Sequence, residues 1–155
     1  MNYQRRSALK TGGGLSIMGL LTSAGLLAPG AAQAEWNKSA FGAKSASDTL
    51  AALNASGAEK SSSVTLVAPE IAENGAVVPM AVSSSLSNVE EVAILIENNP
   101  TPLAAIFTIP AGTEVAIQTR CKMGKTSNVI ALVKADGKFY TASKEVKVTL
   151  GGCGG

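Results

Sequence analysis

From residue 64 to residue 150 the chain consists of short runs rich in β-branched residues, and turn residues separate one run from the next. The spacing of the runs is close to the ~8–12 residues that is typical of strands in a sandwich or barrel. Val92, Ile94 and Ile96 alternate with positions that we expect to point outward, and Asp136-Gly137 is a strong hairpin signal. The pattern predicts a mainly β domain, an antiparallel β-sandwich in which each sheet buries one face. The expected strands are Val64–Ala68, Val77–Ser84, Glu90–Glu97, Leu103–Ile109, Glu114–Lys122, Asn128–Lys134, Lys138–Thr141 and Glu145–Leu150.

Residues 35–63 have a different composition, rich in Ala, Ser and Lys. Ser47-Asp48 is a candidate N-cap, and Leu50 and Leu53 stand at helical spacing before Asn54-Ala55-Ser56-Gly57 ends the pattern. We therefore expect a short helical N-terminal segment that lies against the main body.

Residues 1–34 have the features of an export signal. Arg5-Arg6 lies in a positive n-region, and the apolar run from Leu15 to Ala28 is too short to span a bilayer, which takes about 20 residues. Ala32-Gln33-Ala34 supplies the small-x-small pattern of a signal peptidase site. The adjacent arginines indicate a twin-arginine signal, so we expect Glu35 to begin a periplasmic chain that is exported folded and has no membrane anchor.

Removal of residues 1–34 takes away three basic residues and no acidic ones, which changes the formal charge of the chain from +2 to −1. Without a net positive charge, the chain lacks the electrostatic attraction that nucleic-acid binding requires. The sequence contains no histidine, the commonest general base and transition-metal ligand. Two cysteines alone make a poor zinc site, so we expect neither a metal nor a cofactor nor catalytic machinery.

The chain ends in Gly151, Gly152, Cys153, Gly154 and Gly155. No positive charge lies near Cys153, so nothing in the sequence lowers the pKa of its thiol below the free value of about 8.5. Four glycines make the segment thin and flexible. These properties indicate a swinging arm whose thiol reacts only when another enzyme receives it.

Cys121 allows two interpretations. It shares the parity of Val115 and Ile117, which places it in the core as a small hydrophobe. Alternatively, an exported protein with two cysteines usually joins them, which favours a disulfide between Cys121 and Cys153. Such a bridge would lock the arm.

The terminal segment Leu150-Gly151-Gly152-Cys153-Gly154-Gly155 resembles the signature terminus of the SoxY family of sulfur carriers in bacterial thiosulfate oxidation. Four further segments are similar to the family: residues 69–79, 122–127, 133–138 and 142–148. The twin-arginine leader agrees with this resemblance, although the family is not expected to have a cysteine at position 121.

The resemblance implies an immunoglobulin-like sandwich that forms a heterodimer with a SoxZ-like subunit and travels with it as a folded complex. It implies that Cys153 is the point of covalent sulfur attachment and that Gly151, Gly152, Gly154 and Gly155 form the carrier arm. The implied transient partners are a c-type cytochrome that couples thiosulfate to the thiol, a hydrolase that releases sulfate and, in some organisms, a molybdenum enzyme that oxidises the remaining sulfane sulfur.

Two other functions compete with the carrier hypothesis. One is a structural or binding sandwich whose tail is locked by a disulfide. The other is a ubiquitin-like carrier that is adenylated and converted to a thiocarboxylate at Gly155, against which export and the helix-poor pattern argue.

Overall fold

The computed structural model of the 155-residue chain describes residues 37–149. The expected signal peptide (1–34) and carrier arm (151–155) lie outside the described residues.

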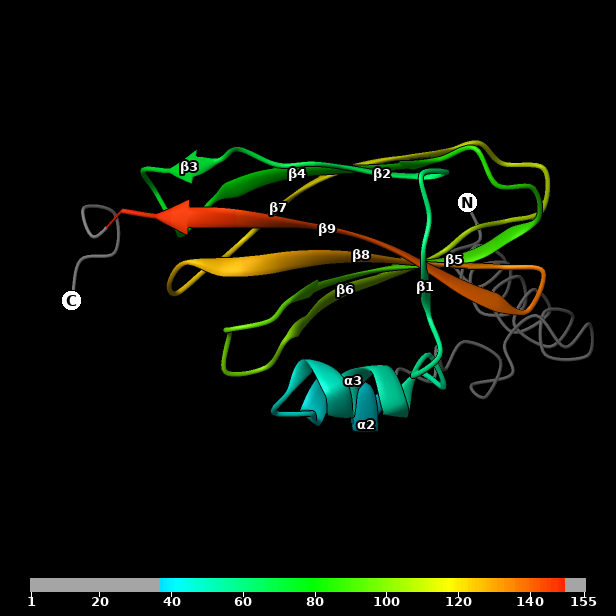
Figure 1. Cartoon of the computed structure of the whole chain (residues 1–155), viewed down its shortest axis with the longest axis horizontal. Coiled ribbons are helices and arrows are strands. Elements are labelled where there is room, and N and C mark those ends of the chain that lie inside the picture. Colours follow the sequence, from blue (N-terminus) through cyan, green and yellow to red (C-terminus); the bar gives the residue numbers. More distant parts are fainter. Residues whose placement is uncertain (1–36, 150–155) are drawn as a thin grey trace, which may run out of the picture. The chain divides into compact units, whose positions relative to one another are not determined.

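Two β-sheets pack face to face (Figure 1). The larger sheet is six-stranded, with the order β1-β9-β8-β5-β6 and with β3 also paired to β9, and the smaller sheet has the order β2-β4-β7. The strands are β1 (Glu59–Lys60), β2 (Val64–Val67), β3 (Ile71–Ala72), β4 (Val78–Ser84), β5 (Val89–Ile96), β6 (Leu103–Thr108), β7 (Val115–Cys121), β8 (Ser127–Ala135) and β9 (Lys138–Val148). All neighbouring pairs are antiparallel except β1 with β9 and β3 with β9, which are parallel. The predicted β-sandwich is confirmed.

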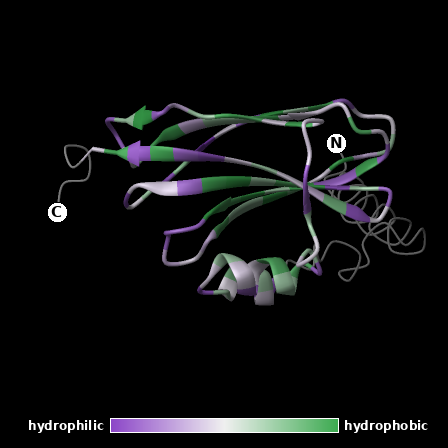
Figure 2. Cartoon of the chain, in the orientation of Figure 1, coloured by the Kyte–Doolittle hydropathy of each residue, from purple (hydrophilic) through white to green (hydrophobic). Residues whose placement is uncertain are grey.

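The main core fills the space between the two sheets. Val78 and Val82 of β4 meet Ile94 of β5 and Val129 and Val133 of β8, and all five side chains are at most 1% exposed. Figure 2 shows the middle of β8 as hydrophobic and hydrophilic stretches along β9, which lies nearer the edge of the sheet. Full burial of a side chain of this size stabilises a fold by about 1.5–3 kcal/mol.

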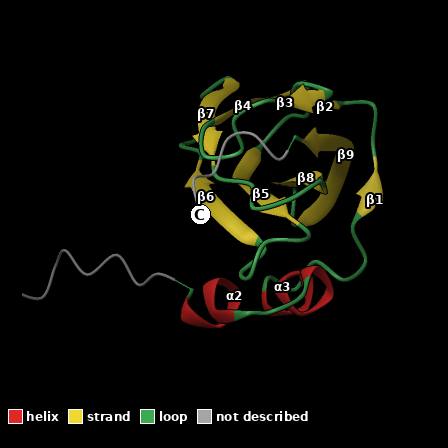
Figure 3. Ribbon diagram, turned by 90° about the vertical axis from the view of Figure 1, so that its left-hand side faces the viewer, coloured by secondary structure: helices red, strands yellow, loops and turns green. Residues whose placement is uncertain are grey.

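Two short helices cover the other face of the larger sheet, as Figure 3 shows. They are α2 (Lys38–Gly42) and α3 (Ala46–Ala52). Under them Ala93, Leu95 and Leu132 are at most 1% exposed. The expectation that each sheet buries only one face is therefore wrong for β5 and β8, because the helical segment converts their outer face into a second core. Neither helix is long and apolar enough to cross a membrane.

The expected helical segment is confirmed, but its N-cap differs. Asn37 caps α2 by accepting a hydrogen bond from the Ala40 amide, at 3.0 Å. Ser45, and not Ser47-Asp48, caps α3: the Ser45 hydroxyl accepts a hydrogen bond from the Asp48 amide at 3.0 Å. Asp48 instead lies in the first turn, where its negative charge interacts favourably with the positive end of the helix dipole.

The last two expected strands are one strand. β9 runs without a break from Lys138 to Val148 and pairs with β8 at nine consecutive positions. Residues 142–144 are Ala-Ser-Lys, which lack the glycine, proline or asparagine that a turn would need, and the ladder continues through them. β1 and β3 were not predicted, because two-residue strands have no detectable periodicity.

We predict that Leu95→Ala lowers the free energy of unfolding by about 2–5 kcal/mol, because it leaves a cavity between the sheet and the helices. Urea denaturation of the mature chain measures the loss. Thr65→Ala, at an exposed position of β2, is the control and is expected to change the stability by less than about 0.5 kcal/mol. An equally small loss for Leu95→Ala would show that the helices do not seal this face.

Candidate functional site

The C-terminal end of β9 is the part of the described structure that adjoins the predicted arm, since Thr149 is the last described residue. Three amide groups fix this end: Lys147 donates to the Glu70 carbonyl at 2.9 Å, Val148 to the Thr126 hydroxyl at 3.0 Å and Thr149 to the Ala72 carbonyl at 3.1 Å. Val146 is fully buried. β9 is therefore held on both sides up to its last residue, by β8 with the loop that precedes it and by β3.

Gly75 makes a close contact that holds the same end together. Its carbonyl accepts a hydrogen bond from the Met123 amide at 2.7 Å. A β-carbon at position 75 would collide with the Met123 carbonyl oxygen and would lie 2.9 Å from Cγ1 of Val148. The Asn74-Gly75 pair, a common turn signal, lies in a turn over residues 74–77, and Asn74 stabilises this turn by accepting a hydrogen bond from the Ala76 amide at 2.9 Å. The sequence indicated the turn but not that its glycine lies against the base of the arm.

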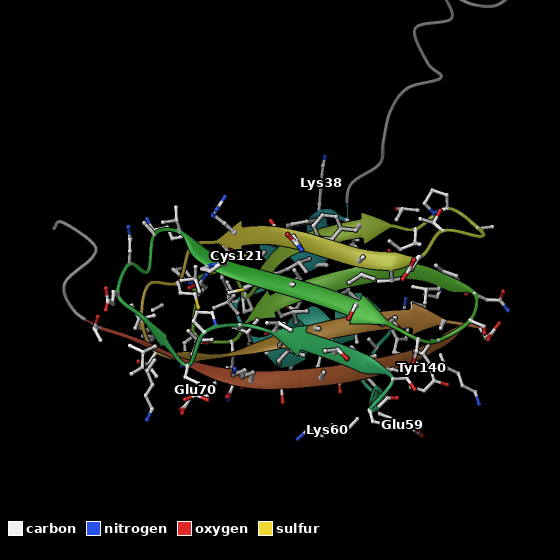
Figure 4. All side chains as sticks on the ribbon, turned by 90° about the horizontal axis from the view of Figure 1, so that it is seen from above. Lys38, Glu59, Lys60, Glu70, Cys121 and Tyr140 are labelled. Atoms are coloured by element: carbon white, nitrogen blue, oxygen red, sulfur yellow. The ribbon has the colours of Figure 1, made fainter. Side chains whose placement is uncertain are left out.

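Cys121 ends β7 opposite Val78 and is 8% exposed (Figure 4). It is a free thiol and belongs to the main core, as its parity with Val115 and Ile117 predicted. Burial raises the pKa of the Cys121 thiol, because the surroundings disfavour the thiolate. The residue is thus a poor nucleophile. A bridge from it to Cys153, which lies outside the described residues, stays a prediction.

The predicted attachment residue Cys153 and the predicted arm glycines Gly151, Gly152, Gly154 and Gly155 lie outside the described residues. Within residues 37–149 no group of three or more carboxylates, cysteines or histidines comes together as a metal site. An open groove of ≈ 670 Å³ crosses the smaller sheet and is lined by residues 67–69, 79–81 and 118–120. Arg120 is the one ionisable residue among these lining residues, so the groove contains neither a nucleophile nor a general base.

The carboxylates and amines with shifted pKa values lie away from the base of the arm. Glu90 and Lys134 form an ion pair near the β8–β9 turn, at the other end of β9. The hydrogen bond from Lys134 and a second one from the Gly137 amide, at 3.0 Å, lower the pKa of the Glu90 carboxyl. The bond to Glu90 in turn raises the pKa of Lys134. Both side chains are partly exposed, so this pair is a surface contact and not an acid–base device.

Comparisons with known proteins agree on one family. Residues 50–153 match the model of the family described as "Sulfur oxidation protein SoxY". Among solved structures, the sulfur carrier protein SoxY from Chlorobium limicola f thiosulfatophilum is 35% identical in sequence, with a TM-score of 0.61. The match covers 73% of this chain and 99% of that one. A comparison with curated proteins gave no match.

We predict that Gly75→Ala destabilises the mature chain by about 1–3 kcal/mol, because the β-carbon must displace the Met123 carbonyl. Hydrogen exchange is expected to quicken first at the amides of Val148 and Thr149. The matched control is Gly57→Ala, where nothing lies within 4 Å of the added β-carbon. Equal exchange at Thr149 in the two variants would contradict the role of Gly75 in fixing the end of β9.

We also predict that Cys121 resists alkylation in the folded protein at pH 8 and reacts fully in denaturant, because the thiol is buried and its pKa is raised. The raised pKa means that the Cys121 thiol keeps its proton to a higher pH in the folded state than in the unfolded state. Its contribution to stability is therefore complete below the unfolded pKa of about 8.5 and is lost as the pH rises through the folded pKa. Mass spectrometry after iodoacetamide treatment counts the labelled thiols; rapid native labelling of Cys121 would refute its burial.

Proposed function

The chain belongs to the SoxY family, and from this premise we propose that it carries sulfur intermediates of thiosulfate oxidation, bound covalently to Cys153. The observation that carries the proposal is the family match, which extends to residue 153 and so includes this cysteine. Gly151, Gly152, Gly154 and Gly155 form the arm that presents the thiol to other enzymes.

The chemistry requires a thiol that accepts and releases a group but does not catalyse the transfers. In the loading step the Cys153 thiol and thiosulfate form a sulfur–sulfur bond, giving Cys–S–S–SO₃⁻, one proton and two electrons, which a c-type cytochrome accepts. In the next step water attacks the terminal sulfone, and a hydrolase releases sulfate and leaves a cysteine persulfide on the chain. Further oxidation of that sulfane sulfur belongs to a molybdenum enzyme in organisms that have one.

The described residues support a carrier without its own catalytic machinery. The sequence has no histidine, and Arg120 is the sole ionisable residue lining the groove on the smaller sheet. The described cysteine is buried and its thiol pKa is raised. Catalysis of the transfers is therefore assigned to the enzymes that receive the arm.

The geometry of β9 suits this role. Its end is fixed at Thr149 by β3 and by the residues before β8. Cys153 is four residues beyond Thr149, and an extended chain spans at most about 3.3–3.6 Å per residue, so the backbone of Cys153 is tethered within about 14 Å of Thr149. A short tether from a rigid base keeps the thiol at a high effective concentration near any enzyme that docks beside it.

Export and partnership follow from the same proposal. The twin-arginine leader supports transport of the folded chain to the periplasm together with a SoxZ-like subunit that has no leader of its own. Membership of the family implies a partner within the Sox system, and a heterodimer with such a subunit explains why a chain without a cofactor would use a route for folded cargo.

The test is intact mass spectrometry after the mature complex is incubated with thiosulfate and its cytochrome partner. We expect wild type to gain one thiosulfate adduct and Cys153→Ser to gain none. Cys121→Ser is the control and is expected to be loaded like wild type, since Cys121 is buried. Equal loading of Cys153→Ser would refute the assignment, and sulfur found on the Gly155 carboxyl would support the thiocarboxylate alternative instead.

A further inference from the structure

One side edge of the sandwich is protected against pairing with another chain, and the opposite edge is not. On one side β9 is covered at both ends by parallel pairing, with β1 at Tyr140 and Thr141 and with β3 at Lys147 and Val148. Between these pairs the Lys144 ammonium donates a hydrogen bond to the Ala68 carbonyl at 2.7 Å. Charges and short capping strands are the usual means by which proteins prevent an edge strand from pairing with another molecule.

On the opposite side, the edges are β6 and β7 (Figure 3). β6 contains no charged residue that could fix the register of a pairing with a strand of another chain. Its own pairing with β5 is irregular between Ile94 and Leu95. β7 pairs with β4 at seven consecutive positions without a bulge, and it contains no proline. Its alternate backbone groups therefore point away from β4 along a regular, unprotected edge.

The sequence of this edge is complementary to itself. Glu114, immediately before β7, and Arg120 are the two charged residues of the segment 113–121, and both are exposed on the outer face together with Ala116 and Gln118. Neither makes an ion pair with another residue of the described range 37–149. In an antiparallel pairing of two β7 strands centred on Ile117, Glu114 of each copy lies opposite Arg120 of the other. Ala116 then lies opposite Gln118, and on the inner face the two Ile117 side chains meet.

We propose that this chain forms a symmetric homodimer in which β7 of one copy pairs with β7 of a second copy in the register centred on Ile117. The pairing joins two three-stranded sheets into one six-stranded sheet. It satisfies the free backbone groups of both edges, and the two-fold symmetry makes each Glu114–Arg120 contact occur twice. In the in-phase register centred on Ala116, Glu114 and Arg120 would both face uncharged residues. In the one centred on Gln118, Glu114 would face Lys122, which lies beyond the end of β7, and Arg120 would face Ala116. Only the register centred on Ile117 pairs Glu114 with Arg120, a charged residue within the strand.

The interface is small, so the dimer is expected to be weak and to depend on concentration and salt. Sedimentation velocity of the mature chain carrying Cys153→Ser, which removes disulfides through the terminal cysteine, gives the dissociation constant over about 1 µM to 1 mM. We expect a monomer–dimer equilibrium that shifts towards monomer at high salt. A chain that stays monomeric over the whole range would overturn the proposal.

Charge reversal tests the register. Arg120→Glu and Glu114→Arg each place like charges opposite one another twice, and each is expected to raise the dissociation constant about tenfold. The double variant restores both pairs and is expected to return the constant to within about threefold of the starting value. Lys138→Glu, an exposed residue of β9 away from β7, is the matched control and should leave the equilibrium unchanged. Failure of the double variant to recover dimerisation would overturn the register.

A cysteine at the symmetry axis provides an independent check. Ile117→Cys in the Cys153→Ser background is expected to form a disulfide-linked dimer under mild oxidation, because residue 117 faces itself across the axis. Thr65→Cys, at an exposed position of β2, should remain monomeric under the same conditions. Because these measurements use a chain without Cys153, they succeed or fail independently of the carrier role.

Discussion

Burial of β5 and β8 on both faces is the constraint on which the rest of the structure depends. Ile94 and Val129 point into the space between the sheets, while Leu95 and Leu132 point under the helices, and none of the four is more than 1% exposed. Such a strand pair has no solvent face, so it requires a cover on each side. The smaller sheet supplies one cover and the helical segment the other, which makes α2 and α3 part of the fold and not an appendage.

This central pair also determines which strands form the edges. β9 pairs with β8 along nine positions and is then closed off by β1, β3 and the Lys144 contact, whereas β6 and β7 are left at the opposite side. The protected side is the one that adjoins the proposed arm. The open side presents unpaired backbone groups and is the natural place for a neighbouring chain. The two proposals for this chain, a covalent carrier and a strand-paired dimer, thus use different sides of one sandwich.

Much of the fold follows from periodicity, and the departures have physical causes. The expected strands 77–84, 103–109 and 114–122 agree with β4, β6 and β7 to within one residue at each end. The Asp136-Gly137 turn adopts positive φ at both residues, 50° and 72°, as its sequence requires. The second buried face of β5 was not predicted, because a run such as Ala93-Ile94-Leu95-Ile96 does not reveal what covers it. The contact between Gly75 and Met123 depends on residues 48 positions apart, and no local pattern reports it. The terminal Gly-Gly-Cys-Gly-Gly segment is recognisable in the sequence alone, whereas the rigid base that precedes it is visible only in the structure.

The attachment of the terminal segment to the end of β9 has a mechanical consequence. The terminal residues continue directly from β9, so a pull on them that is directed along the axis of β9 acts on the whole strand. A pull in this direction loads in shear the nine residue pairs between β9 and β8, together with the pairings to β1 and β3. The backbone hydrogen bonds of these pairs must therefore break together and not one after another. A load along this axis is therefore shared by the whole length of β9 and does not detach its last residues first.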